Sequence, residues 1–362
     1  MSENNQTQDN KSIEEVRDGN FLTLKQQEKV KTNLMWVAIF SIIMLFAGVT
    51  SGYIVASGTD FWLNLKLPTQ FTISTIIIIL SSLSLWGATH FVKQNKLSLA
   101  TPLVGITLIL GLMFGYLQFK GFRTMHKEGN AVVGGIINIE GKYGDYYTLY
   151  YKNKEISFDG NDYYWQGKKV DADLKQKMID FSNSLKKEAK KDEQSIADYG
   201  TFMVKYKGEP VILQNNHLTL NNNALTSNQK QRLFRFADAI ATGRGDFIMI
   251  GEYGKDFTLN YKGKPVEYKN RKFYQNGQEL SEYQLNKLYS TQNRTSSFII
   301  AFVFIHLLHW LAGIIVLIVL FIKTLKQKYT PQNYVGLKIG SIYWHFLGIL
   351  WLYLYLFLIF FH

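Results

Sequence analysis

Five long apolar runs alternate with polar segments along this chain of 362 residues. An α-helix needs roughly 20 mainly apolar residues to cross the hydrocarbon core of a bilayer. Each run meets this length, so the pattern predicts five membrane-spanning helices, at about 34–56, 72–92, 98–119, 297–322 and 341–361. The chain is therefore expected to be an all-α membrane protein, a five-transmembrane-helix bundle, that carries one large polar insert.

The insert lies between the third and fourth runs, and its length of about 175 residues is enough for a domain with its own core. The residues before the first run are polar and mixed in charge, and that run is too long and begins too late for a cleavable signal peptide. The expected organisation is an N-terminal segment (1–33), three spans (34–119), the insert (120–295) and two further spans (296–362).

Lysines in the short loops predict the orientation, because positively charged loops stay on the cytoplasmic side of a membrane. Three of the short connecting segments or ends carry several lysines each: Lys25, Lys29 and Lys31, then Lys93 and Lys96, then Lys323, Lys326 and Lys328. The loop between the first two spans has only Lys66. We therefore expect a cytoplasmic N-terminus, with the insert and the C-terminus on the periplasmic side.

The insert contains three similar stretches, which begin at Tyr143–Gly144, Tyr199–Gly200 and Tyr253–Gly254. A tyrosine–lysine pair recurs at matching places, at Tyr151–Lys152, Tyr206–Lys207 and Tyr261–Lys262. Sequence repeats of this size are typical of stacked supersecondary units that share a core. The pattern predicts a threefold repeat.

Each of the three stretches has the same local pattern. Alternating apolar and polar residues around a Lys-Asn or Lys-Gly turn predict a β-hairpin. A second hairpin is expected to follow, with its turn at Asp159–Gly160 in the first stretch and near Lys269–Asn270 in the third. An amphipathic helix follows in each stretch. Its expected capping residue is Asp171 in the first, Thr226 or Ser227 in the second, and Ser281 in the third. We predict an α+β periplasmic insert of three repeated hairpin-plus-helix units.

The insert shows no recognisable catalytic chemistry. It has a single histidine, His217, and no clustered acids, nucleophile motif or phosphate-binding loop. The whole chain has no cysteine, which excludes disulfides and thiolate metal sites. The net charge of +12 is dispersed along the chain, so nucleic-acid binding is not expected.

Three histidines lie inside the apolar runs, at His306, His309 and His345. Polar side chains in hydrocarbon are costly unless they find partners on other helices. Three interpretations remain open: polar links between helices, contact with a lipid headgroup or a proton relay, and metal ligation. Four tryptophans of the apolar runs are expected to be packing residues or interface anchors, namely Trp36, Trp310, Trp344 and Trp351. The spacing of Gly111 and Gly115 is typical of closely packed membrane helices.

Four motifs, taken together in chain order, resemble the subunit III family of the heme–copper cytochrome c oxidases. They are MWVAIFSIIMLFAGVTSGY (35–53), LPTQFTISTIIIILSS (67–82), SFIIAFVFIHLLHWLAG (297–313) and YWHFLGILWLYLY (343–355). The third span adds a family-like Gln118. The resemblance covers all five spans and none of the insert, and the spans resemble helices three to seven of long family members.

The resemblance implies an accessory subunit III of a bacterial respiratory cytochrome c oxidase in the cell's inner membrane. Such a subunit would be part of a proton-translocating oxidoreductase but would have no catalytic residues, cofactor or metal of its own, since the family has heme and copper on subunits I and II. It would contact these two subunits and hold structural phospholipid. The insert would then face a respiratory partner, either a quinol–cytochrome c reductase complex in a supercomplex or a membrane-bound cytochrome c.

One residue departs from the family pattern in a way that affects function. The family usually has a buried glutamate after the serine of the first of these helices, and this chain has Ile42 there. A proton role tied to that glutamate is therefore not expected.

The alternative to an oxidase subunit is a stand-alone, membrane-anchored periplasmic binding or scaffold protein. A transporter is not favoured, since the interiors of the spans contain no acidic residue.

Overall fold

The computed structural model describes residues 24–137, 146–159, 162–190, 201–214, 217–242, 247–270, 272–331 and 333–361. Most of the predicted N-terminal segment, the Tyr143–Gly144 and Tyr199–Gly200 pairs, and Gly160 lie outside these residues. The chain divides into two compact units. One, here called the helical unit, comprises residues up to 55, 67–124 and 298–362, and the other, the insert unit, comprises 56–66 and 125–297.

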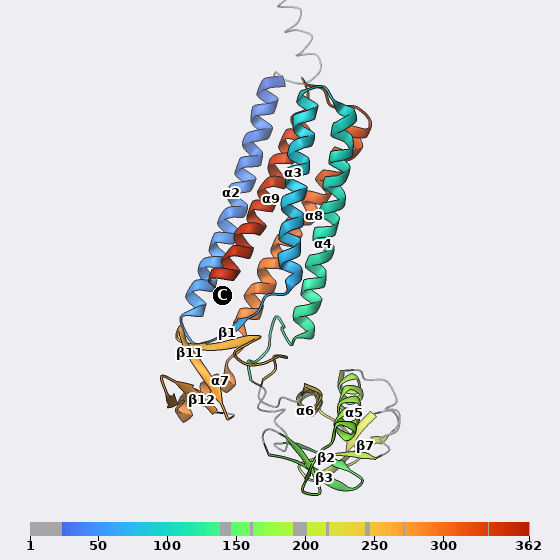
Figure 1. Ribbon diagram of the computed structural model, residues 1–362, viewed down its shortest axis with the longest axis vertical. Helices are drawn as coiled ribbons and strands as arrows, with labels where there is room; N and C mark the ends of the chain where they lie inside the picture. The colour runs from blue at the N-terminus through green and yellow to red at the C-terminus, as the bar shows by residue number, and fades with distance from the viewer. Residues whose placement is uncertain are drawn as a thin grey trace, which may run out of the picture. The chain divides into compact units, whose positions relative to one another are not determined.

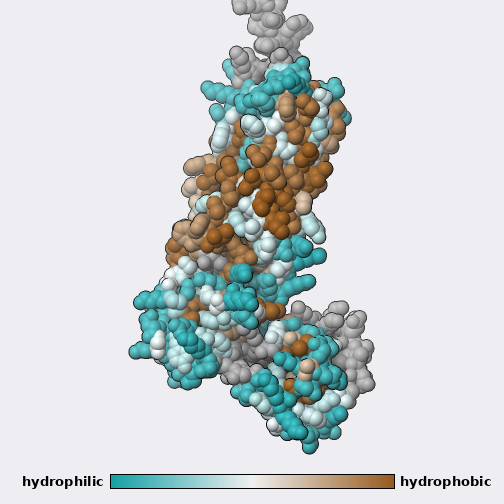
Figure 2. Space-filling view, in the orientation of Figure 1, coloured by the Kyte–Doolittle hydropathy of each residue, from teal (hydrophilic) through white to brown (hydrophobic). Residues whose placement is uncertain are grey.

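The helical unit is a bundle of five long helices, drawn side by side in Figure 1. They are α2 (Leu24–Ser57), α3 (Thr69–Lys93), α4 (Leu97–Lys127), α8 (Arg294–Leu325) and α9 (Val335–Phe360). All five are long and apolar enough to cross a membrane. Figure 2 shows apolar side chains over much of the middle of the bundle's visible face and polar side chains at its upper end, a distribution suited to contact with lipid. The prediction of a multi-pass, five-span membrane protein is confirmed.

The insert unit combines strands and helices, as predicted. Its first strand, β1 (Phe61–Leu65), comes from the short segment between α2 and α3, for which the sequence pattern predicts no element. The rest of the unit forms four strands and one helix in each of three successive stretches. These are β2 (Tyr147–Tyr151), β3 (Lys154–Phe158), β4 (Tyr163–Trp165), β5 (Lys168–Lys169) and α5 (Ala172–Lys190); β6 (Phe202–Tyr206), β7 (Glu209–Gln214), β8 (His217–Leu220), β9 (Asn223–Ala224) and α6 (Ser227–Thr242); and β10 (Phe257–Tyr261), β11 (Lys264–Lys269), β12 (Lys272–Gln275), β13 (Gln278–Glu279) and α7 (Glu282–Ser290).

Two-residue turns with positive φ connect the first two strands of each stretch. They occupy Lys152–Asn153, Lys207–Gly208 and Lys262–Gly263, where the sequence predicts hairpins. Turns of the same kind follow the third strand of each stretch, at Gln166–Gly167, Asn221–Asn222 and Asn276–Gly277. The two-residue fourth strands after them are absent from the prediction, because a two-residue strand leaves no alternation to detect. Each stretch is therefore a four-strand meander.

The strands form two antiparallel sheets. The larger has eight strands in the order β5-β4-β3-β2-β6-β7-β8-β9, so that β2 and β6 join the first two meanders at its centre. The smaller has five strands in the order β1-β10-β11-β12-β13, so that β1 joins the third meander. The first strand of every meander is thus paired on its outer edge.

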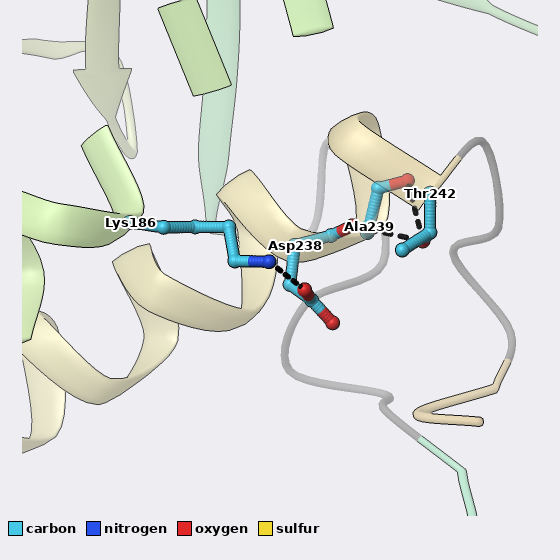
Figure 3. A network of polar contacts seen from close by, with 4 residues as sticks. All are labelled: Lys186, Asp238, Ala239 and Thr242. Carbon is cyan, nitrogen blue, oxygen red and sulfur yellow. Dashed lines mark hydrogen bonds and ion pairs between the residues drawn. The ribbon is translucent and has the colours of Figure 1, made fainter. Parts of the chain in front are cut away.

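Helices α5 and α6 cover the eight-stranded sheet and pack against each other. Buried apolar side chains from both layers form the core, among them Leu149, Val204, Leu233 and Phe236. Lys186 of α5 pairs with Asp238 of α6, next to the Thr242 hydroxyl that donates to the carbonyls of Asp238 (2.8 Å) and Ala239 (3.4 Å) (Figure 3).

The predicted helix caps are present. Asp171 accepts a hydrogen bond from the backbone N–H of Leu174 (2.8 Å), and Thr226 and Ser281 form reciprocal capping boxes with Gln229 and Gln284. Thr226, rather than Ser227, is the capping residue of α6. Such caps satisfy backbone N–H groups that a helix leaves unpaired at its start.

The hydroxyl of Tyr253 provides a pH-dependent test of the third meander. It donates to the carbonyl of Val266 and accepts from the backbone N–H of Leu259 (3.3 Å). Burial, chiefly, and the nearby Glu267 raise the pKa of Tyr253 from 10 to about 12. Because the folded state holds this proton more tightly than the unfolded state, its stabilising effect is complete below pH 10 and is lost as the pH rises through about 12.

We expect Tyr253→Phe to remove this part of the alkaline destabilisation, measured as the fall in the thermal midpoint of the insert between pH 10 and 12. A difference titration of parent minus variant should show one phenol that ionises near pH 12. Tyr283→Phe is the matched control, since Tyr283 is 72% exposed. A Tyr253 phenol that titrates near 10 would contradict the structure.

Candidate functional site

One face of α3 carries a row of small hydroxyl residues that are buried in the helical unit: Ser74, Thr75 and Ser81. Ser74 and Thr75 donate to the carbonyl of Phe71 at 2.8 Å, inside their own helix. A hydroxyl that donates in this way still has lone pairs for another group. The α3 face is therefore a set of hydrogen-bond acceptors at membrane depth.

Two tryptophans of α9 use these acceptors. The indole N–H of Trp344 donates to the Ser81 hydroxyl (3.0 Å), and that of Trp351 donates to the Thr75 hydroxyl (2.9 Å). Both indoles are almost fully buried, where an unpaired N–H would be costly. The seven-residue spacing of the tryptophans places them on one face of α9. The pairs run in opposite directions along the two helices, so α3 and α9 are antiparallel.

Helix α4 joins the same network. The Ser81 hydroxyl donates to the carbonyl of Thr107 (3.2 Å), so that one side chain links α9, α3 and α4. The amide of Gln118 donates to Ser74 (2.9 Å). These groups and the α9 tryptophans are here called the polar seam. Ser74 and Ser81 are seven residues apart and Thr75 follows Ser74, a helical spacing that could have identified them from the sequence as one buried face.

The Gly111–Gly115 pair of α4 packs against tryptophan side chains. The indole N–H of Trp310 on α8 donates to the carbonyl of Gly111 (3.0 Å). A Cβ atom added to Gly115 would lie 2.1 Å from the Trp310 ring, and one added to Gly111 would lie 2.8 Å from the Trp344 ring. The spacing predicted close contact between helices, whereas these two glycines leave room for indole rings.

The three histidines have different environments. His345 lies in the seam, where its Nδ1 hydrogen-bonds the Ser82 hydroxyl of α3. The Nδ1 of His309 is 2.8 Å from the Ile305 carbonyl of its own helix, and its ring lies against Phe46 of α2. Of the three, His345 is the one whose side chain has a hydrogen bond to another helix among the described residues.

His306 is the most buried of the three, with 1% of its surface exposed. Its ring lies between Phe114 of α4 and Trp351 of α9, with centroid distances of 5.8 and 5.3 Å. Its Nδ1 has no hydrogen-bond partner among the described residues, and neither does the Oε1 atom of the buried Gln118. Among those residues the ring makes aromatic contacts with two neighbouring helices.

Two other candidates lie away from the seam. Trp36 of α2 is 56% exposed, so its ring faces the surroundings of the bundle. Ile42, at the position of the family glutamate, is partly exposed on the same helix. Within the part of the chain that the structure describes, no three His, Cys, Asp or Glu side chains gather as a metal site.

The insert unit has a separate hollow of about 390 Å³ at one end of the first meander. It is lined by Tyr151, Trp165, Lys168 and Lys169 and by the start of α5. The indole N–H of Trp165 donates to the Tyr151 carbonyl (3.2 Å), so this side chain links strand β4 to strand β2. The residues that line this hollow include no serine, cysteine or histidine.

The five apolar helices and their buried polar seam define a multi-pass helical membrane protein with an α+β insert. Residues 273–362 match the sequence model of the family described as cytochrome c oxidase subunit III. A cytochrome c oxidase subunit 3 from Felis catus is 40% identical over 50 residues, which are 14% of this chain and 19% of that relative. The C-terminal region of this chain is therefore similar to the cytochrome c oxidase subunit III family, and the chain spans about a fifth of the length of the relative it matches.

The seam predicts the effect of removing one indole N–H. We expect Trp351→Phe to destabilise the bundle by about 1–2 kcal/mol, because the hydrogen bond to Thr75 is lost in a medium without water. Unfolding in mixed detergent and dodecyl sulfate measures this. Trp86→Phe is the matched control, since Trp86 is 64% exposed on α3. Equal effects of the two substitutions would contradict a structural role for the seam.

A second prediction concerns the space at Gly115. We expect Gly115→Ala to destabilise the bundle by about 1–3 kcal/mol, because the new methyl group would overlap the Trp310 ring. Gly48→Ala in α2 is the control, since no atom lies within 4 Å of its added Cβ, and it should be neutral or stabilise by up to about 1 kcal/mol. The same unfolding assay compares them, and a tolerated Gly115→Ala would argue against the observed position of the indole.

Proposed function

We propose that this chain is an accessory subunit III of a bacterial respiratory cytochrome c oxidase. The observation that carries the proposal is the family match over residues 273–362, a region that contains all of α9 with its seam tryptophans. The family is that of an oxidase subunit, and a bundle with a closely packed polar seam suits a subunit that supports a catalytic neighbour. Oxidase subunits I and II, with their heme and copper, are the proposed partners.

The proposed role of the helical unit is to support the catalytic subunit and to hold phospholipid against it. The outer face of α2 supports this role, since Leu34, Val37 and Phe40 are each more than 60% exposed. Apolar surface of this kind is suited to acyl chains or to another membrane helix. His306, His309 and His345 are proposed to serve packing, with His345 linking two helices.

The insert unit is proposed to lie on the periplasmic side, with the N-terminus in the cytoplasm. The lysines of the short loops support this orientation. We further propose that its three meander-plus-helix stretches are repeated units, and that the insert docks a periplasmic-side partner of the oxidase. The proposed partner is a respiratory supercomplex neighbour or a membrane-bound cytochrome c. The excess of basic residues favours an acidic surface on that partner.

The alternative is a membrane-anchored periplasmic binding or scaffold protein that acts alone. The observation that favours it is the size of the insert unit, which includes residues 125–297 and forms two sheets with their own helices.

Copurification separates the two functions. We expect an affinity-tagged chain, solubilised from its host in mild detergent, to elute with two larger oxidase subunits. A reduced-minus-oxidised spectrum of the eluate should show heme bands, because those subunits carry the redox centres. An unrelated tagged membrane protein from the same host is the control. A solitary, heme-free chain would overturn the proposed function and favour the alternative.

Replacing residues 125–290 with a short Gly/Ser linker tests the docking role. We expect the oxidase subunits to copurify with this variant, because their contacts lie on the helical unit. A periplasmic-side neighbour that migrates with the parent complex on a native gel should be lost. If the variant complex keeps the same neighbours as the parent, the docking role is wrong.

A further inference from the structure

The strand β1 occupies an unusual place in the chain. It comes from the short segment between two membrane helices, yet it pairs antiparallel with β10 of the insert, about 200 residues later in the sequence. The register places Phe61 opposite Tyr261, Leu63 opposite Leu259 and Leu65 opposite Phe257. These six side chains lie on one face of the sheet, and all are buried.

The first two meanders pair with each other in the same way. In the β2–β6 pair, Tyr147 lies opposite Tyr206, Leu149 opposite Val204 and Tyr151 opposite Phe202. Both strand pairs therefore have two aliphatic residues opposite each other at the centre and at least one aromatic ring at each end. The ring centroids are 4.5 Å apart for Phe61–Tyr261 and 5.0 Å apart for the equivalent pair, Phe202–Tyr151. Strand β1 holds the position relative to β10 that β6 holds relative to β2.

The hydrogen bonds that frame the two pairs also match. In the larger sheet, the backbone N–H of Lys152 donates to Thr201, and that of Lys207 donates to Tyr146, both at 2.8 Å. In the smaller sheet, the backbone N–H of Lys262 donates to the Asp60 carbonyl at 3.1 Å. These three lysines are the ones that recur after a tyrosine in the sequence. Their shared structural task is to bind the end of an incoming strand.

The sequence of β1 resembles that of the strand to which it binds. Residues 61–65 are FWLNL and residues 257–261 are FTLNY, with phenylalanine, leucine and asparagine at matching positions. An ion pair adds a contact beside the strand, between Asp60 and Lys287 of α7 (2.7 Å). The β1 segment thus has the apolar pattern of a meander's first strand without the rest of a meander.

We propose that the edge of β10 is a strand-binding site for an extended peptide with large apolar side chains at alternate positions. Its occupant is the chain's own segment 61–65, which takes the place of the first strand of another meander. Backbone hydrogen bonds supply the affinity of such a site, and the alternating side chains supply its specificity. The third meander is therefore complete only when the segment between α2 and α3 is bound to it.

Replacing residues 61–65 in the full-length chain tests this proposal. A YTLYY segment, copied from Tyr147–Tyr151, keeps the apolar pattern, whereas WFNLL keeps the parent composition but places asparagine at position 63, opposite Leu259. Hydrogen exchange of residues 257–261 is the readout, and residues 147–151 in the other sheet are the internal control. We expect exchange at 257–261 to stay within about twofold of the parent with YTLYY and to rise by about tenfold or more with WFNLL, with 147–151 unchanged in both.

The proposal is overturned if WFNLL protects residues 257–261 as well as the parent does, or if YTLYY fails to protect them. Should either variant not reach the membrane, a cysteine pair in the otherwise intact, cysteine-free chain provides the test. Leu63→Cys with Leu259→Cys places two thiols on one face of a directly opposed pair, so a disulfide should form. Trp62→Cys with Leu259→Cys places them on opposite faces and should not, and absence of the first disulfide would also overturn the proposal.

Discussion

The structure of the helical unit depends on one constraint: an indole N–H in hydrocarbon must find an acceptor, because no water is present to supply one. Trp344 and Trp351 meet this constraint with the hydroxyls of Ser81 and Thr75. The acceptors fix which face of α3 is buried and which helix lies against it. Since Ser81 also donates to α4, the same hydroxyl sets the position of a third helix.

The insert unit meets a related constraint with strands. An unpaired strand edge presents free backbone N–H and C=O groups and invites association with other chains. The first strands of the first two meanders pair with each other, and that of the third pairs with β1. In both units a polar group that water would otherwise satisfy is matched by a group from a distant part of the chain. Long-range pairing is thus the common basis of the two units.

The bundle buries polar groups of several kinds. Its buried polar groups are indoles, hydroxyls, amides and imidazoles, and most of them are engaged in links that hold helices in place. His345 contributes one such link, whereas the ring of His306 lies between two aromatic rings. These roles agree with an accessory subunit whose neighbours perform the reaction, which is the function proposed for the C-terminal family match.

The number and type of the membrane helices, the α+β nature of the insert and the caps at Asp171 and Ser281 were determined by sequence alone, because each rests on local periodicity or on a few adjacent residues. The partners of Trp351 and Leu63 were not, since Thr75 and Leu259 are remote in the sequence and many hydroxyls and leucines could serve. The GxxxG spacing indicated a close contact, but only the packed structure decided that tryptophan rings would fill the space. Local patterns reflect hydrogen bonds between near neighbours, whereas the choice among distant partners is made when all side chains must fit at once.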